Sequence, residues 1–82
     1  MLIHIKYFAS IREALGPGMA HQTQACTLAG LRDELLALSP VHAATLARNR
    51  PVRMALNQVM CNEASSLEDG SEVAFFPPVT GG

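Results

Sequence analysis

The last eight residues of the chain, FFPPVTGG, offer the clearest opportunity for chemistry. Pro77 and Pro78 favour an extended backbone that has little freedom to lose on docking. The residues after them reach up to about 13 Å further at full extension. Gly81 and Gly82 have no side chains, so they can enter a passage that excludes larger residues. The sequence therefore predicts a flexible tail over 77–82 that can carry a terminal group away from the domain.

The only functional group at the tip of this tail is the Gly82 carboxylate. A carboxylate is a poor electrophile, but joining it to AMP gives a mixed anhydride with a good leaving group. Sulfur or nitrogen nucleophiles can attack that anhydride. A disordered end without a function is the alternative, because chain termini are commonly disordered. The residues alone leave both interpretations open.

Other catalytic patterns are absent from the sequence. It has no glycine-rich phosphate loop, no paired carboxylates at a useful spacing and no Ser/His/Asp set. Cys26 and Cys61 do not form a CxxC pair, so we expect two separate buried or half-buried thiols in a reducing cytosol. His4, His21 and His42 are far apart, and we expect no metal site. The chain is therefore not expected to be catalytic alone.

The composition predicts one small globular domain over 1–82. The chain has 82 residues, of which 49% are hydrophobic and 16% charged. Its net charge is −1 and its basic residues are scattered, which argues against nucleic acid or an anionic membrane as a partner. It has no apolar run of about 18 residues and no signal-peptide pattern. We therefore expect a cytoplasmic protein.

The first third of the chain predicts strand, short helix, strand. Alternation over 1–8 places one set of side chains toward a core and a second set on the opposite face. The core set is Met1, Ile3, Ile5 and Tyr7, and the opposite set is Leu2, His4, Lys6 and Phe8. Ser10 and Glu13 have capping-box spacing and Gly16 suits a helix end, which predicts a short helix between them. A weaker strand over 19–25 is expected to return antiparallel to the first.

A longer helix is predicted from Thr27, which can cap it, to Ser39-Pro40, which ends it. Leu28, Leu31, Leu35 and Leu38 recur at helical spacing and form one apolar stripe. Arg32, Asp33 and Glu34 are expected to point to solvent. Residues 41–51 predict a short helical or irregular segment.

The last third predicts three strands. Two short ones flank a turn at Asn57-Gln58, and a turn at Asp69-Gly70 precedes the final strand. On that strand Val73 and Phe75 share the core face, while Phe76 lies on the other. One long helix can cover only one face of the sheet. We therefore expect an α+β domain in which a mixed sheet keeps its second face uncovered.

Three stretches resemble a known family. "DGSEVAFFPPVTGG", together with "FASIRE" near the start and "ALNQ" in the middle, resembles the small subunits of molybdopterin synthases, which are ubiquitin-like β-grasp sulfur carriers. The resemblance covers essentially the whole chain. Ser71 stands where that family is expected to have an acidic residue, and 16–26 and 39–51 carry no family motif.

The resemblance implies a carrier cycle. An activating enzyme similar to the one that activates ubiquitin would adenylate Gly82 with ATP, and sulfur transfer would then produce a C-terminal thiocarboxylate. The tail would enter the large synthase subunit, in an expected heterotetramer, and donate sulfur to the pyranopterin precursor in molybdenum cofactor biosynthesis. No cofactor is expected to stay bound to this chain, because the ATP is consumed by the activating enzyme.

The resemblance also assigns roles to individual residues. Gly82, with Gly81, would form the reactive end, and Pro77, Pro78, Val79 and Thr80 would thread into the partner. Phe8, Met60 and Phe76 would form an apolar docking surface, although Phe8 and Phe76 could instead belong to the edge of the core. Arg12 would sit near a partner acid or lie on a solvated helix face.

Two other functions remain compatible with these residues. A sister carrier for thiazole or tRNA thiolation would use the same tail chemistry with a different acceptor. A ubiquitin-like protein modifier would end in isopeptide linkage to lysines. The double aromatic and double proline before the glycines favour the molybdopterin pathway.

Overall fold

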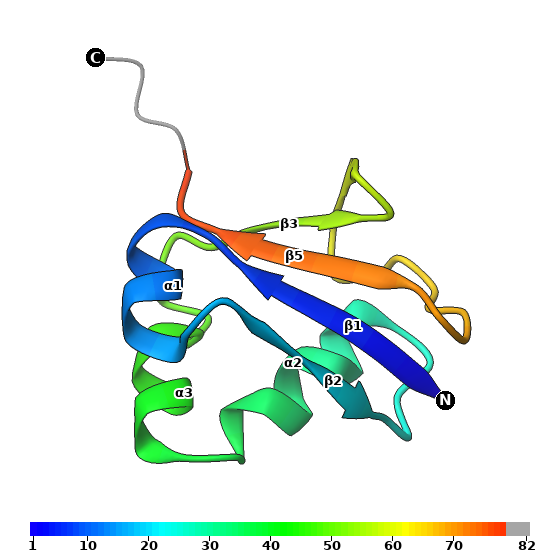
Figure 1. Cartoon of the computed structure of the whole chain (residues 1–82), viewed down its shortest axis with the longest axis horizontal. Coiled ribbons are helices and arrows are strands. Elements are labelled where there is room, and N and C mark those ends of the chain that lie inside the picture. Colours follow the sequence, from blue (N-terminus) through cyan, green and yellow to red (C-terminus); the bar gives the residue numbers. More distant parts are fainter. Residues whose placement is uncertain (79–82) are drawn as a thin grey trace.

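The computed structural model describes residues 1–78, so Val79, Thr80, Gly81 and Gly82 lie outside the described residues. The elements are five strands and three helices (Figure 1). In chain order they are β1 Leu2–Tyr7, α1 Ala9–Leu15, β2 Gly18–Gln22, α2 Leu28–Leu36, α3 Pro40–Thr45, β3 Arg53–Leu56, β4 Val59–Cys61 and β5 Glu72–Phe76.

The strands form one mixed sheet in the order β2-β1-β5-β3-β4. The central strands β1 and β5 are parallel, whereas the other three pairings are antiparallel. Figure 1 shows the sheet as one layer with α2 behind it. This arrangement confirms the expected α+β domain and its ubiquitin-like β-grasp topology.

The core lies between the sheet and α2, and its side chains follow the predicted periods. Ile3, Ile5 and Tyr7 of β1 and Val73 and Phe75 of β5 are each no more than 2% exposed. Leu28, Leu31 and Leu35 of α2 are completely buried against them. Burial of such side chains is the main force that holds the helix on the sheet.

Two expected core residues lie outside it. Leu38 is 47% exposed, because α2 ends at Leu36 and the helical stripe is not continued to this position. Ser39 instead caps α3, where its side chain accepts a hydrogen bond from the His42 amide. Met1 precedes β1 and is also exposed.

The predicted capping box at Ser10 and Glu13 is wrong. The N-cap of α1 is Phe8, which has no side-chain cap, and the helix begins one residue before Ser10. The reason is that Phe8 still belongs to the strand ladder: its amide donates to the Phe75 carbonyl at 3.1 Å. Its own carbonyl accepts from the Arg12 amide at 3.2 Å, so the chain passes directly from strand to helix. Gly16 ends α1 with φ 91°, as predicted.

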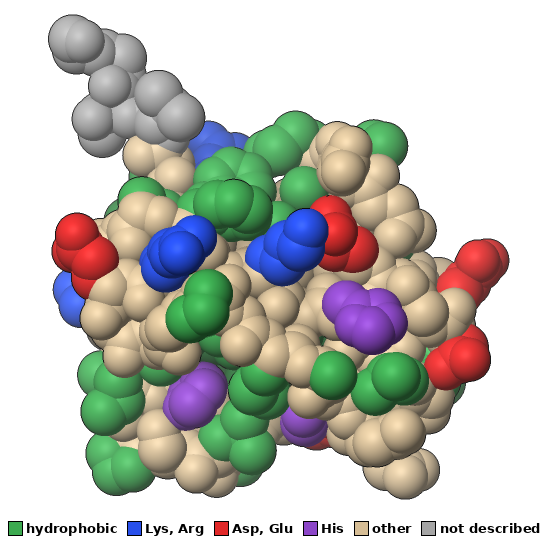
Figure 2. All heavy atoms as spheres, viewed as in Figure 1, with side chains coloured by type: hydrophobic (Ala, Val, Ile, Leu, Met, Phe, Trp, Pro, Cys, Tyr) green, Lys and Arg blue, Asp and Glu red, His purple; other side chains and the backbone are tan. Residues whose placement is uncertain are grey.

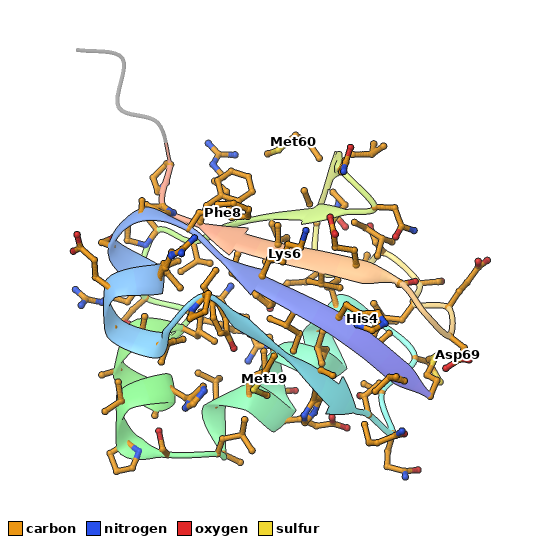
Figure 3. The ribbon with its side chains drawn as sticks, in the orientation of Figure 1. His4, Lys6, Phe8, Met19, Met60 and Asp69 are labelled. Carbon is orange, nitrogen blue, oxygen red and sulfur yellow. The ribbon has the colours of Figure 1, made fainter. Side chains whose placement is uncertain are left out.

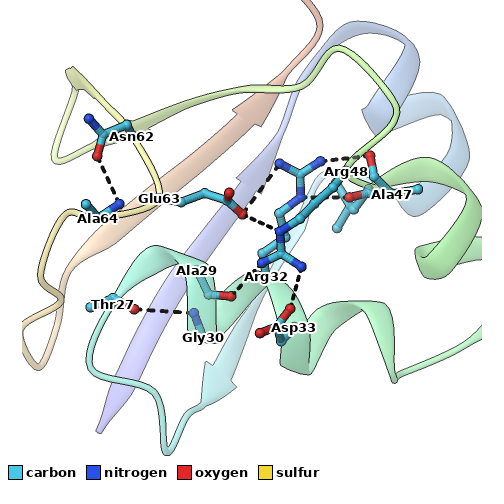
Figure 4. A network of polar contacts seen from close by, with 11 residues as sticks. Thr27, Ala29, Gly30, Arg32, Asp33, Ala47, Arg48, Asn62, Glu63 and Ala64 are labelled. Carbon is cyan, nitrogen blue, oxygen red and sulfur yellow. Dashed lines mark hydrogen bonds and ion pairs between the residues drawn. The ribbon is translucent and has the colours of Figure 1, made fainter.

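The polar side chains of α2 do not all point to solvent as predicted. Arg32 is 4% exposed and donates to the carbonyls of Leu46 and Ala47 at 2.7 and 2.9 Å. Figure 4 shows Arg48 in the same network, where its guanidinium donates hydrogen bonds to the carboxylates of Glu63 and the exposed Asp33. The segment after α3 crosses this face of α2 and buries it, which no helical period could predict.

Glu34 is also engaged by another part of the chain. It accepts hydrogen bonds from the side chains of His21 and Thr23 and from the Gln24 amide, at 2.9, 2.7 and 3.0 Å. The segment that leaves the edge strand β2 is thereby tied to α2. His4 and His21 lie on opposite faces, because His4 pairs with Ala20 and His21 with Ile3.

The β3–β4 hairpin has the predicted turn. Asn57 and Gln58 have φ 50° and 69°, the left-handed values that a tight hairpin turn requires. Asn57 also exchanges two hydrogen bonds with Glu72, which fixes the hairpin to β5. Among residues 1–78, no helix is long and apolar enough to cross a membrane.

Candidate functional site

The face of the sheet opposite α2 is a candidate docking surface. Strand register places Lys6, Ala74, Ala55 and Met60 in one row across four strands, and sets Phe76 opposite Arg53. We call the apolar part of this surface the open face; it comprises Phe8, Ala55, Met60, Ala74 and Phe76. Figure 2 shows hydrophobic side chains gathered on this side, at the end of the sheet from which the tail leaves.

The predicted apolar interface residues Phe8, Met60 and Phe76 lie on this face. Phe8 is 44% exposed and Met60 is 59% exposed, so both side chains are accessible to a partner. Figure 3 shows both side chains at the tail end of the sheet. Phe76 is half-buried, whereas its neighbour Phe75 is completely buried on the other side. Exposed apolar side chains gathered on one face mark a surface that a partner can cover.

Beyond the open face, the surface opposite α2 carries charged and polar side chains. Lys6 pairs with Glu72 at 2.9 Å, and His4 lies beyond them on β1 (Figure 3). The residues of the open face therefore lie toward the end of the sheet from which the chain continues into the tail. A partner that covers this part would also meet the residues that follow β5.

The tail begins from a rigid base. Strand β5 ends at Phe76, and Pro77 cannot continue the ladder because it has no amide proton. The Phe75 ring is fully buried, with its centroid 6.2 Å from that of Tyr7. Pro77 and Pro78 are both half-buried. The direction in which the chain leaves the sheet is thus held by the core. The predicted threading and reactive positions after Pro78 lie outside the described residues.

A surface pocket of about 240 Å³ adjoins this base on the helix side of the sheet. Its lining includes Ser10, Ile11 and Ala14 of α1, together with Arg50, Val52 and Pro77. Sequence reasoning did not find Arg50 or Ala14, because residues distant in the chain form this pocket and no local pattern marks it.

Arg12 is exposed on α1. Among residues 1–78, no acidic side chain lies within ion-pair distance of it. Its pairing with a partner acid stays a prediction.

The described part of the chain offers no nucleophile with an activating base. Ser39 and His42 are 2.8 Å apart, but Ser39 also caps α3 through the His42 amide, so the pair is explained as part of a helix start. Burial raises the pKa of the Cys61 thiol, which keeps it protonated and weakly nucleophilic. Within residues 1–78, no group of His, Cys, Asp and Glu side chains could hold a metal ion. Cys26 is exposed, contrary to the expectation that both thiols are buried or half-buried, whereas Cys61 is half-buried as expected.

Comparisons with known proteins agree with this geometry. A family model described as the ThiS family matches residues 5–82. The chain is 37% identical to a protein of Escherichia coli strain K12 named molybdopterin synthase sulfur carrier subunit, over 99% of this chain and 100% of that protein. It is 30% identical to the protein of the same name from Haemophilus influenzae, with the same coverage.

Among solved structures, it is similar to a protein–protein complex of subunits 1 and 2 of the molybdopterin-converting factor from Helicobacter pylori. The TM-score is 0.72 at 23% identity, and the match covers 100% of both chains. At that identity the likeness establishes the fold, while the family model and the two curated relatives establish the relationship. The chain belongs to the ThiS family.

Proposed function

We propose that this protein is the sulfur carrier subunit of a molybdopterin synthase, and that it carries sulfur as a thiocarboxylate on Gly82. The observation that supports this most is the position of the tail. Its base, Pro77 and Pro78, leaves the sheet directly beside the exposed Phe8 and the half-buried Phe76 of the open face. A partner that covers the open face can therefore receive the tail in the same binding event. Both curated relatives carry this function in their names.

The proposed cycle begins with activation of the carboxylate. An oxygen of Gly82 attacks the α-phosphorus of ATP on a separate activating enzyme, and pyrophosphate leaves. Sulfur supplied by a donor as hydrosulfide then attacks the carbonyl carbon of the acyl-adenylate, AMP leaves with its bonding electrons, and loss of the sulfur-bound proton gives the thiocarboxylate. ATP is thus a substrate of the activating enzyme, and the proposal needs no cofactor bound to this chain.

The second half of the cycle takes place on the large synthase subunit. The thiocarboxylate sulfur forms a C–S bond to a carbon of the pyranopterin precursor, and an oxygen substituent leaves that carbon. Water then cleaves the resulting thioester at the Gly82 carbonyl, so the sulfur stays on the pterin as a thiol and Gly82 returns to the carboxylate. This chain contributes docking and delivery, while the large subunit supplies the pterin site. A complex of two large and two small subunits in the cytoplasm is part of the proposal.

Intact-protein mass spectrometry tests the first half. Incubation with the activating enzyme, ATP and a sulfur donor should give a mass gain that corresponds to one oxygen replaced by one sulfur. A variant lacking Gly82 should show no gain. An unchanged mass of the wild-type chain beside a competent activating enzyme would rule out the thiocarboxylate.

Two further measurements separate the alternatives. The large synthase subunit should capture this chain from solution, whereas capture only by a thiazole synthase would assign it to the thiazole pathway. Under activating conditions, electrophoresis should show no covalent conjugates to lysines of other proteins. A ladder of such conjugates would support a protein modifier instead.

A further inference from the structure

The arginines of this chain fall into two groups. Arg32 and Arg48 contact the carboxylates of Glu63 and Asp33 and hold the helix layer together (Figure 4). In contrast, Arg12, Arg50 and Arg53 have no carboxylate within ion-pair distance among residues 1–78. The fold therefore explains the first group and leaves the second without a charge partner among residues 1–78.

Two arginines of the second group flank the base of the tail. Arg53 pairs with Phe76 across the β3–β5 ladder, so it lies on the open face next to Pro77. Arg50 lines the pocket that Pro77 borders on the helix side. Its Nε donates to the Ala44 carbonyl at 3.3 Å, which positions the side chain at the end of α3. Strand register thus places Arg53 on the side of the sheet opposite α2, and the pocket places Arg50 on the helix side of the point where the chain leaves the sheet.

The pocket is suited to one side chain of a partner. Its volume of about 240 Å³ is below the roughly 300–1,000 Å³ of typical small-molecule sites. Its lining is mixed: Ile11, Ala14, Val52 and Pro77 are apolar, Ser10 and Thr45 add hydroxyl groups, and Arg50 is the cationic group. Pro77 joins this pocket to the open face, so a single partner surface can cover both.

We propose that Arg50, Arg53 and this pocket form a second docking element for the large synthase subunit. That subunit would bear carboxylates around the entrance that receives the tail, and one apolar side chain that enters the pocket. The inference rests on the proposed function, because it names the partner of the same tail. Arg50 belongs to the segment 39–51 in which the resemblance to the carrier family offers no motif, so the contact is argued from the fold of this chain.

Charge placement adds a reason for directed association. Glu68 and Asp69 lie at the opposite end of the molecule from the tail, as the label of Asp69 in Figure 3 shows. The acidic Glu13 of α1 makes no ion pair with the three arginines. A partner with an acidic entrance would be attracted to the tail end of this chain and repelled from the opposite end. The two proteins would therefore associate with the tail oriented toward that entrance.

The test measures association of the full chain with the large synthase subunit of the same organism. Rates are compared at about 0.1 M and about 1 M salt, where the screening length falls from about 10 Å to about 3 Å. The double variant Arg50→Gln/Arg53→Gln should associate about three- to tenfold more slowly at low salt, since rim charges act mainly on association. The difference in association rate between the double variant and the wild type should shrink at about 1 M salt. Arg50→Lys should keep most of the wild-type rate.

Two further variants make the result specific. Arg50→Gln/Glu68→Gln restores the wild-type net charge, yet it should stay as slow as Arg50→Gln because Glu68 lies far from the tail. Ala14→Met occupies the pocket from an exposed helix position and should increase the dissociation rate severalfold. Circular dichroism of each variant checks that the fold is retained.

The inference is overturned if the double variant associates like the wild type at low salt, or if Glu68→Gln restores the rate. The mass gain on Gly82 is measured separately. A normal mass gain with unchanged association rates would contradict this inference alone, whereas a missing mass gain would contradict the proposed function. A wild-type chain that gains sulfur but does not bind the large subunit would contradict both the inference and the proposed acceptor.

Discussion

The Tyr7 hydroxyl is the only buried side-chain polar atom in residues 1–78 without a hydrogen-bond partner. Tyr7 is 1% exposed, and burial raises the pKa of its phenol. A buried hydroxyl without a partner costs about 1–3 kcal/mol of stability. The ring itself packs in the core beside Phe75, so only the hydroxyl oxygen lowers the free energy of unfolding.

Replacing Tyr7 with Phe should therefore increase the free energy of unfolding by about 1 kcal/mol in urea denaturation at pH 7. The wild type should also lose stability above about pH 10, because the unfolded phenol ionises there while the folded one stays protonated. The Tyr7→Phe variant should not show the part of this stability loss above about pH 10 that comes from ionisation of Tyr7.

Tyr7→Leu is the control, since it removes the ring as well as the hydroxyl. It should lower the free energy of unfolding through lost packing. A Tyr7→Phe variant less stable than the wild type would mean that the hydroxyl does find a partner in solution.

At the scale of elements, Gly30 determines how α2 meets the segment before it. A Cβ at this position would lie 2.9 Å from the Cβ of Ala25, which is closer than such atoms normally approach. The glycine costs about 1 kcal/mol of helix propensity relative to alanine. The close approach of Ala25 explains why glycine occupies this helical position despite that cost.

Gly30→Ala should thus fail to stabilise the protein, and should lower its free energy of unfolding by about 1 kcal/mol as strain outweighs propensity. Adding Ala25→Gly removes the opposing methyl group. Thermal and urea unfolding of both single variants and the double variant form a cycle, in which a favourable coupling between the two changes is expected. Additive effects would show that these two positions do not clash.

Glu34 connects the segment after β2 to α2, and its acid–base behaviour reports that contact. Burial alone would raise the pKa of this carboxyl group, but the hydrogen bonds from Thr23, His21 and the Gln24 amide lower it below its usual range. The contact therefore stabilises the fold above the ordinary carboxyl pKa of 4.5, and the contribution is lost as pH falls through the lower, folded pKa.

Glu34→Gln should lower the free energy of unfolding by about 1 kcal/mol at pH 7, because the hydrogen bonds lose their charged acceptor. The difference from the wild type should narrow as the pH is lowered below 4.5. Glu68→Gln, at an exposed turn, is the control and should change little across the same range. A constant difference between wild type and Glu34→Gln at all pH values would contradict the proposed charge effect.

These elements also show what sequence can and cannot predict. The faces of β1 and β5 were predicted correctly because a strand alternates with period two, and Thr27 was predicted as the α2 cap from its residue type and position. Arg32 and Glu34 were misplaced because segments distant in the chain cover the polar face of α2. The capping box failed because Phe8 belongs to both a strand ladder and a helix start. The pocket at Pro77 depends on α1, α3 and the segment before β3 coming together, which no local period encodes.

At the scale of the whole molecule, the two faces of the sheet have different roles. The helix layer buries one face and secures the base of the tail, while the open face keeps its apolar side chains available beside that base (Figures 1 and 3). Phe8 lies where these roles meet, since its backbone begins α1 and its side chain belongs to the open face. Binding and folding can therefore be separated at this residue.

The Phe8→Ser variant should change binding to the large synthase subunit without lowering the stability of the fold. Serine is a favourable N-cap residue, and the Phe8 backbone already has the extended angles of an N-cap. The free energy of unfolding should thus stay within about 1 kcal/mol of the wild type or rise. Docking loses an aromatic side chain whose burial is worth about 1.5–3 kcal/mol, so the dissociation constant for the large synthase subunit should rise at least about tenfold in calorimetry. The control Val41→Ser changes a residue that is 51% exposed on α3, away from the open face, and should bind like the wild type. If Phe8→Ser binds as tightly as the wild type, or if Val41→Ser weakens binding equally, then the open face is not the surface that brings the tail to its acceptor.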